Sequence, residues 1–202
     1  MLQNTEINIK NRIYGHGKGW CFTVGHFSDL GNHEAVKKAL QRLQQSGLIR
    51  RVSRGLYDYP RQHEKLGTLP PDVDLIAKAI AQRYGVRIQQ SGAYAANAVG
   101  FSEQVPARVV YVTDGVPKKV KIGKLEINFR RTTPQNTALA GTKMGLLIQA
   151  LRHFGEQRID EKMEQTLKRH LDKIAPQEIK KALKYAPIWV RELINRLLKE
   201  EK

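Results

Sequence analysis

Side chains that hydrogen-bond to the edges of DNA bases are concentrated between residues 32 and 54. Arginine, glutamine and asparagine form paired hydrogen bonds with guanine or adenine in the major groove, and lysine binds guanine or phosphate. The segment 33–46, HEAVKKALQRLQQS, lies between Asn32, a favourable helix N-cap, and Gly47, which suits a helix C-terminus. We therefore predict a DNA-reading helix whose contacting side chains are Asn32, His33, Lys37, Lys38, Gln41 and Arg42.

The apolar periodicity of the same segment supports the helix. Val36, Leu40 and Leu43 recur at steps of four and three, which places them on one stripe that faces a core. At about 100° per residue, the opposite arc is polar and mostly cationic. A solvated basic face on an ordinary amphipathic helix is the alternative interpretation of this pattern.

The elements expected around this helix complete a known DNA-binding arrangement. After the helix, residues 48–52 and 56–59 are short β-prone runs that predict a hairpin with Arg54 at its tip. Arg50 or Arg51 would project toward the DNA backbone, and we assign Arg51 together with Arg54 to DNA contact. Before the helix, residues 3–13 and the segment HFSDLG (26–31) are predicted as a first helix and a short supporting helix. This order predicts a winged helix-turn-helix over residues 1–60.

Composition agrees with a polyanionic partner. The 202 residues carry a formal net charge of +16 and have a pI near 10.1, so we expect attraction to nucleic acid with a strong dependence on salt. We found no 18-residue apolar run and no signal-peptide pattern, so the sequence predicts a cytoplasmic protein without membrane association. The single cysteine, Cys21, lies in an apolar run and is predicted to be a buried core thiol.

A second domain is predicted after a linker. Residues 61–71 contain proline, glycine and charged residues without an apolar period, which is typical of a linker. Residues 72–202 are predicted to form a mixed α/β domain with a helical C-terminal tail. We expect helices over 72–85 and 92–99, strands over 86–90 and 108–113, and a hairpin across Gly123-Lys124. The fold class is therefore α+β.

The predicted hairpin of the second domain is the densest basic segment of the chain. Its cations are Lys118, Lys119, Lys121, Lys124, Arg130 and Arg131, against Glu126 alone. In one interpretation they contact DNA phosphates or an acidic protein partner. In the other, they are edge-strand charges that prevent the sheet from pairing with other chains. The sequence favours neither.

Enzyme motifs are not found. The glycine-rich segment 15–19 lacks the GK[ST] ending of a phosphate loop, although Lys18 within it could contact a DNA phosphate. The histidines show no metal-ligand spacing, and no nucleophile lies in a recognisable catalytic arrangement. We therefore expect no catalytic residues, no metal and no cofactor. A catalytic site assembled from distant residues would leave no local signature and stays an alternative.

Three segments resemble a known family. The predicted wing RRVSRGLYDYP, the segment SGAYAANAVGFSEQVP with the following YVTDG, and ALAGTKMGLLIQALRHFG are similar to the AbiEi-like antitoxins of bacterial AbiE abortive-infection systems. The resemblance implies a winged helix that represses its own operon and a C-terminal antitoxin domain. It also implies a co-encoded nucleotidyltransferase-like toxin, neutralised in the type IV manner without a stable complex.

Carried over by position, the resemblance implies roles for two regions. DNA reading of the protein's own double-stranded operator falls on residues 32–45 with Arg51 and Arg54. The antitoxin role falls on Ser91–Pro106, with Ser91, Tyr94, Asn97 and Phe101 as candidates. Alternatively, a small-residue helix packed on a sheet needs such residues for fit alone. A winged-helix regulator or a protein-interaction module with a basic surface and no toxin partner is the alternative function.

Overall fold

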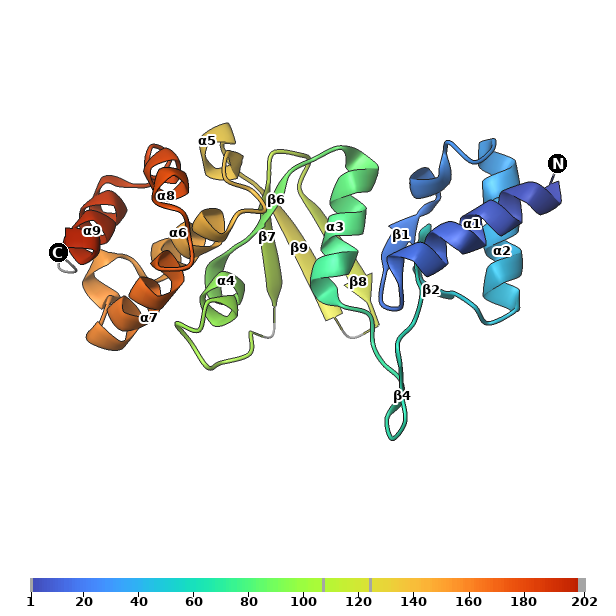
Figure 1. The fold of residues 1–202 in the computed structure, drawn as a ribbon, viewed down its shortest axis with the longest axis horizontal. Coiled ribbons are helices and arrows are strands. Elements are labelled where there is room, and N and C mark those ends of the chain that lie inside the picture. Colours follow the sequence, from blue (N-terminus) through green and yellow to red (C-terminus); the bar gives the residue numbers. More distant parts are fainter. Residues whose placement is uncertain (1, 107, 124, 200–202) are drawn as a thin grey trace. The chain divides into compact units, whose positions relative to one another are not determined.

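Helices and strands are mixed along the chain, which confirms the predicted α+β class (Figure 1). The computed structural model describes residues 2–106, 108–123 and 125–199. The chain divides into two units. Unit 1 is Met1–Val86 with Lys121–Gly123, and unit 2 is Arg87–Val120 with Lys124–Lys202.

Unit 1 begins with helical segments that alternate with the strands of a small sheet. In chain order the elements are α1 (Leu2–His16), β1 (Cys21–Thr23), the 3-10 helix η1 (Val24–Phe27), α2 (His33–Gln45), β2 (Arg50–Ser53) and β3 (Leu56–Asp58). Strand β3 lies between β1 and β2 and is antiparallel to both. Helix α2 contacts both α1 and η1.

The core of unit 1 forms where the apolar period predicted it. Val36, Leu40 and Leu43 of α2 are buried, together with Ile9 and Ile13 of α1. The apolar stripe of α2 therefore faces the core, and its polar arc faces solvent. Burial of this stripe stabilises the orientation of α2, since rotating the helix would expose three large apolar side chains.

Both ends of α2 lie where the sequence predicts them. The Asn32 side chain accepts a hydrogen bond from the Ala35 backbone N–H at 2.9 Å, as expected of an N-cap. Gly47 follows the helix with a φ of 75°, in the left-handed region that glycine adopts without steric cost.

The short supporting helix differs from the prediction. It is a 3-10 helix that begins at Val24 and ends at Phe27, whereas we expected residues 26–31. The His26 ring accounts for the shift, because its Nδ1 accepts a hydrogen bond from the Thr23 backbone N–H at 3.1 Å. This bond fixes the start of η1 before His26, the residue at which the sequence pattern predicted that the helix begins.

The buried thiol was predicted correctly. Cys21 lies in β1 with a side chain that is 3% exposed. Burial, followed by the neighbouring charges of Asp58 and Asp72, raises the pKa of Cys21 to about 12. The neutral thiol is therefore a packing group of the core at physiological pH.

The structure corrects the predicted domain division at residues 61–71 and at the helix that follows them. Within the expected linker, β4 (Gln62–His63) pairs with β5 (Gly67–Thr68) as a short hairpin that projects from unit 1 (Figure 1). Helix α3 (Val73–Tyr84), which we assigned to the second domain, belongs to unit 1. The division falls after Val86.

Long-range contacts explain why α3 joins unit 1. The helix contacts β1 and β3, and its residues Ile76, Ala77 and Ile80 are buried. The segment before it is held by Arg50, which donates a hydrogen bond to the Leu69 carbonyl at 3.0 Å. Proline and glycine content predicted a linker here, and it gave no information about the β4–β5 hairpin or about these contacts.

Unit 2 contains a four-stranded sheet in the order β6-β7-β9-β8. Its strands are β6 (Ile88–Gln90), β7 (Val109–Thr113), β8 (Lys118–Ile122) and β9 (Leu125–Arg131). Strand β6 is antiparallel to β7, whereas β7 and β9 are parallel, so the sheet is mixed. Strand β8 is an edge strand.

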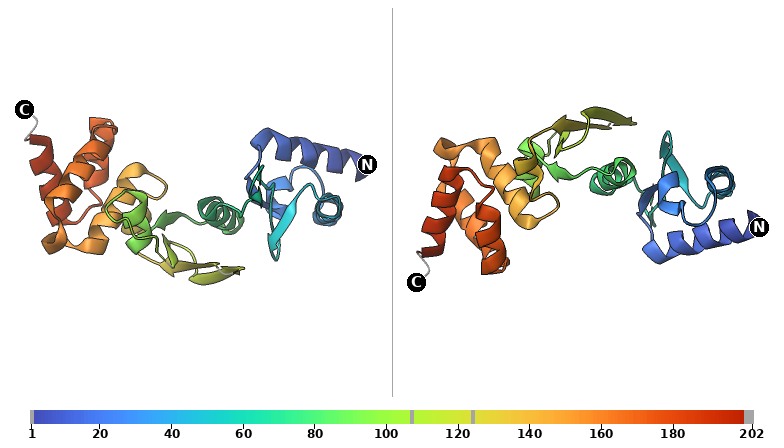
Figure 2. Two further views of the ribbon diagram at one scale, coloured as in Figure 1. Left: turned by 90° about the horizontal axis from the view of Figure 1, so that it is seen from below. Right: turned by 90° about the horizontal axis from the view of Figure 1, so that it is seen from above.

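Helices form the rest of unit 2 and its main core (Figure 2). They are α4 (Gly92–Ala98), α5 (Pro134–Thr137), α6 (Lys143–Phe154), the 3-10 helix η2 (Glu156–Arg158), α7 (Glu161–Leu171), α8 (Pro176–Leu183) and α9 (Ile188–Lys199). Met144, Leu147, Ile148 and Leu151 form an apolar stripe of α6 that is buried in this core. Among the described residues, no helix is both long enough and apolar enough to cross a membrane.

Candidate nucleic-acid interface

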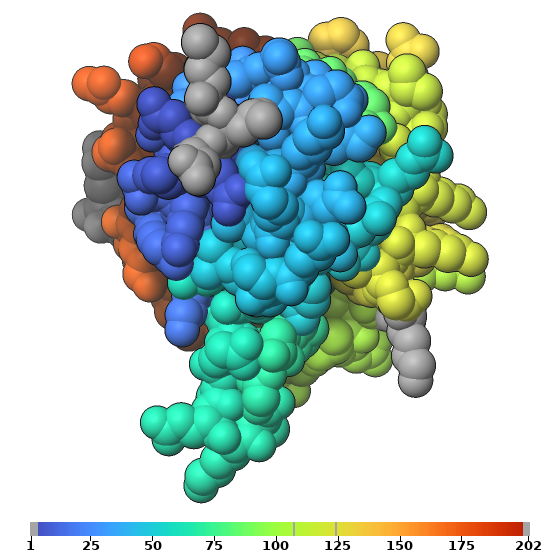
Figure 3. Space-filling view, turned by 90° about the vertical axis from the view of Figure 1, so that its right-hand side faces the viewer, coloured from blue at the N-terminus to red at the C-terminus, as the bar shows by residue number. Residues whose placement is uncertain are grey.

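The outer arc of α2 forms an exposed polar surface on unit 1. Figure 3 looks onto the α2 segment (light blue), with residues of the segment that follows it (cyan) visible beside it on the same face. His33, Lys37, Lys38 and Gln41 are exposed along this arc, as predicted. Their side chains are long or aromatic and lie on a helix whose other side is anchored in the core, so they can reach a groove while the helix stays fixed.

Glu34 lies in the first turn of α2, close to Lys37 and His33. Its Oε1 lies 3.8 Å from Lys37 Nζ and 3.6 Å from His33 Nδ1, and all three side chains are more than half exposed. A carboxylate in the first turn favours the helix dipole, and exposed pairs of this kind are weak. Lys38 and Gln41 form no hydrogen bond or ion pair within the part of the chain that the structure describes.

Two of the predicted reading residues have structural partners. Asn32 uses its side-chain oxygen to cap α2. Arg42 donates from Nε to Glu6 Oε2 of α1 at 2.5 Å, so its guanidinium ties the two helices together. The sequence did not reveal this pair, because its partners are 36 residues apart. We therefore take Lys38 and Gln41 as the centre of the surface.

The two neighbouring arginines of β2 have different environments. Arg50 forms two hydrogen bonds with Asp58, Nε to Oδ1 at 3.0 Å and Nη2 to Oδ2 at 2.6 Å, and this pairing raises the pKa of Arg50. Arg51 is exposed, because consecutive strand residues point to opposite faces. The selection of Arg51 rather than Arg50 for the surface thus agrees with the geometry.

The β2–β3 turn has Arg54 exposed at its tip, followed by Gly55 with a φ of 72°. A second cation lies against this turn. The Arg83 guanidinium of α3 approaches to 3.1 Å from the position that a Cβ on Gly55 would occupy. Sequence reasoning missed Arg83, because it placed α3 in another domain.

Lys18 is also accompanied by an arginine that the sequence did not single out. Lys18 is exposed in the turn between α1 and β1. The side chain of Arg61 comes within 3.2 Å of the position that a Cβ on Gly19 would occupy. Gly19 has a φ of 97°, so its backbone suits glycine and leaves room for the arginine. Unit 1 therefore presents more cations near its predicted surface than the motif alone contains.

The basic hairpin of unit 2 is exposed where the structure describes it. Its exposed cations are Lys118, Lys119, Lys121, Arg130 and Arg131. Lys124, which we also predicted as a contact residue, lies outside the described residues. The first three belong to β8, an edge strand, as the second interpretation of the hairpin expected. The exposure of Lys119 and Lys121 agrees with both interpretations.

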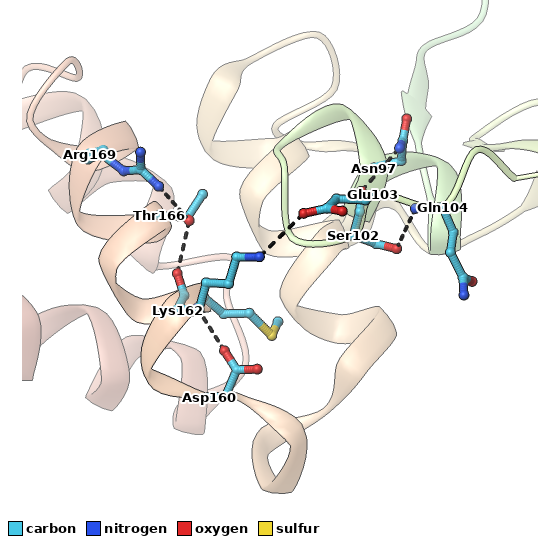
Figure 4. Close-up of polar contacts among 9 residues, drawn as sticks. Asn97, Ser102, Glu103, Gln104, Asp160, Lys162, Thr166 and Arg169 are labelled. Carbon is cyan, nitrogen blue, oxygen red and sulfur yellow. Dashed lines mark hydrogen bonds and ion pairs between the residues drawn. The ribbon is translucent and has the colours of Figure 1, made fainter.

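The candidates from the antitoxin-like segment make internal contacts. Asn97 Nδ2 donates to the Ser102 carbonyl at 3.1 Å, as Figure 4 shows. Tyr94 contacts the Tyr111 ring edge-on with 5.8 Å between ring centroids. Phe101 packs against the main core of unit 2. These three side chains support the fold of the segment.

Ser91, the fourth candidate, connects the segment to α6. Its hydroxyl donates to Gln149 Oε1 at 3.4 Å. The loop after α4 is linked to α7 by the exposed pair of Lys162 and Glu103, 3.4 Å apart (Figure 4). Within residues 2–106, 108–123 and 125–199, no three metal-ligating His, Cys, Asp or Glu side chains lie together.

Comparison with known proteins gives a family and similar solved structures. Residues 8–179 match a family described as a family of unknown function, DUF6088. The crystal structure of the RV2827C protein from Mycobacterium tuberculosis is similar with a TM-score of 0.42 and 14% sequence identity, covering 89% of this chain and 71% of that chain. No curated protein matches the sequence. Since the family match spans most of the chain, this protein belongs to the family of unknown function DUF6088.

Proposed function

We propose that the protein binds double-stranded DNA in a sequence-specific manner, with unit 1 acting as a winged helix-turn-helix. The observation that carries the proposal is the orientation of α2. Its apolar stripe is buried, while Lys38 and Gln41 are exposed to solvent. The α2 segment and the segment that follows it are visible on one face of unit 1 (Figure 3). The element order and the strand order β1-β3-β2 support the proposal of a winged helix domain.

The side chains of this surface suit separate roles in DNA recognition. Gln41 is an amide that pairs with adenine, and Lys38 serves guanine or phosphate. Arg51 and Arg54 of the hairpin, with Arg83 beside its tip, suit phosphates or a narrow minor groove. The charge of +16 favours association with any DNA, so only base contacts from α2 would provide discrimination.

Binding to the DNA upstream of the protein's own gene tests this proposal. Fluorescence anisotropy is measured with that fragment and with a scrambled fragment of the same base composition. We expect the wild type to prefer the upstream fragment and the Lys38→Ala/Gln41→Ala variant to lose at least about tenfold in affinity for it. Equal affinity of the wild type for both fragments, or full retention of the preference in the double variant, would contradict the proposal.

Lys10→Ala provides the matched control. Lys10 is also an exposed helical lysine, but it lies on α1, over the ring of Tyr14. The Lys10→Ala substitution removes the same charge as Lys38→Ala, so a general electrostatic effect would weaken DNA binding equally in the two variants. Lys38→Ala is expected to reduce the slope of log affinity against log salt by about 0.9 for each phosphate that it ceases to neutralise.

We extend the proposal to autorepression and to an antitoxin function, which would require the cytoplasmic location expected from the sequence. This part is supported by the resemblance of residues 91–106 and of the following strand to AbiEi-like antitoxins. Co-expression tests it: the adjacent gene should be toxic alone and harmless with this protein, without a stable complex between the two products. A harmless neighbouring gene would refute the antitoxin function and leave DNA binding untouched. A protein-interaction module would instead show an acidic protein partner and no DNA preference.

A further inference from the structure

A small pocket in unit 2 is lined by polar side chains and by one arginine. It is open to solvent, and α5 and α6 provide most of its lining. The side chains that matter here are Gln135, Asn136, Gln149, Arg152 and Tyr185. None of the lining residues is acidic, so the positive charge of Arg152 has no counter-charge in the pocket wall.

The hydrogen bonding of Arg152 is incomplete. One terminal nitrogen, Nη1, donates to Asn136 Oδ1. The Nε atom is buried without a hydrogen-bond partner, and Nη2 forms no hydrogen bond to any described residue. Burial lowers the pKa of Arg152, with no nearby carboxylate to oppose this effect. A buried N–H group without a partner, such as this Nε–H, is unfavourable unless an anion or ordered water completes its hydrogen bonding.

Five other arginines of the chain are neutralised internally. Their guanidinium groups form ion pairs with carboxylates at 2.5–2.7 Å, namely Arg12 with Asp29, Arg42 with Glu6, Arg50 with Asp58, Arg87 with Asp114 and Arg196 with Glu164. Arg152 is more enclosed than an exposed surface arginine and has only a neutral amide as its partner. The difference indicates that its counter-ion comes from outside the chain.

The surroundings hold the guanidinium in place. The side chain of Asn136 is held at its amide nitrogen, because Nδ2 donates a hydrogen bond to Thr132 Oγ1 at 2.8 Å. Gly145 forms part of the wall and allows the Leu139 carbonyl to come close to α6. A Cβ on Gly145 would lie 2.2 Å from that oxygen. The pocket is therefore built by tight packing of α6 against the segment before it.

We propose that this pocket binds an oxyanion, the phosphate or carboxylate group of a small molecule. Arg152 supplies the charge and Nη2 as a donor, while the Gln135 amide and the Tyr185 hydroxyl supply further hydrogen bonds. Tyr185 is 40% exposed, which leaves the rest of the molecule an exit to solvent. This site lies in unit 2 and does not depend on DNA binding by unit 1.

Thermal unfolding and arginine-selective NMR of the full chain test the site. Inorganic phosphate, acetate and chloride are compared at constant ionic strength. We expect phosphate or acetate to raise the Tm by a few degrees over chloride and to shift the Nε–H signal of Arg152, which is assigned by its loss in Arg152→Gln. A response to phosphate alone identifies a phosphate group as the ligand, and a response to acetate alone identifies a carboxylate. If neither anion has an effect, the proposal is wrong.

Two variants separate the pocket from general charge effects. Asn136→Asp places a carboxylate at the Nη1 contact, so we expect a higher Tm without added anion and no response to phosphate or acetate. Arg191→Gln removes an exposed arginine of α9 and should respond like the wild type. A full anion response in Asn136→Asp, or its loss in Arg191→Gln, would overturn the proposal. The Asn136→Asp result decides the matter if Arg152→Gln does not fold.

Discussion

The ion pair between Arg50 and Asp58 should be a principal stabilising contact of unit 1. Asp58 is 1% exposed and accepts two hydrogen bonds from Arg50, which also donates to the Leu69 carbonyl. Removing one partner of a fully buried pair costs about 3–5 kcal/mol. Because the Arg50 side chain is 33% exposed and water can solvate part of it, we expect Asp58→Ala to cost about 2–3 kcal/mol.

Urea denaturation followed by tryptophan fluorescence measures this cost. The two tryptophans are Trp20 in unit 1 and Trp189 in unit 2, so a Trp189→Phe background reports unit 1 alone. With a slope of roughly 1–3 kcal/mol per molar urea, Asp58→Ala should lower the midpoint by about 1–2 M. Replacement of both partners, in Arg50→Met/Asp58→Ala, should recover part of the loss, because no unpaired charge remains.

The double-mutant cycle provides the decisive comparison. If the pair acts as a unit, the two single losses exceed the double loss by about 1–2 kcal/mol. Strictly additive losses would show that Arg50 and Asp58 act independently. A loss below about 0.5 kcal/mol for Asp58→Ala would show that the pair is no stronger than an exposed salt bridge and would refute the reasoning.

Three further predictions concern packing, pH and thiol reactivity. Gly145→Ala should destabilise unit 2 by about 2 kcal/mol or more in urea denaturation, since its Cβ would collide with the Leu139 carbonyl, whereas Gly15→Ala in α1, with no atom within 4 Å of its Cβ, should be neutral or stabilising. The pKa of His26 is lowered chiefly by burial, so protonation of His26 opposes folding. The Tm of unit 1 should therefore fall as the pH decreases below about 6.5, and it should fall less in His26→Gln. An equal slope of Tm against pH in the wild type and in His26→Gln would exclude His26 as the cause. Cys21, with its raised pKa, should resist a thiol-specific disulfide reagent at pH 8 until urea unfolds unit 1, and rapid labelling of the native protein would contradict its burial.

Local patterns were sufficient for the elements of the candidate interface. The period of Val36, Leu40 and Leu43, with Asn32 and Gly47 at the two ends, predicted α2 and its buried side correctly. These signals lie within one helix, where the spacing of residues decides which of them share a face. The basic hairpins were also predicted, because turn residues and β-prone runs act over short distances.

Ion pairs between residues far apart in the chain decided which side chains of the candidate interface are available for contact with a partner. Arg42 appeared to be a reading residue but is paired with Glu6, and Arg50 is held by Asp58 while Arg51 remains exposed. Arg83 joined the surface only because α3 packs on β1 and β3. Such roles depend on which charges meet in space, and the helical or strand period of one segment contains no information about its partners.

Periodicity, capping and charge in the sequence were thus enough to predict an α+β protein with an outward-facing cationic helix. The packing of α3, the division after Val86 and the pocket around Arg152 followed from contacts between residues far apart in the chain. The physical reason is that helix and strand preferences act over a few residues, whereas burial and ion pairing select among distant partners only when the whole core closes.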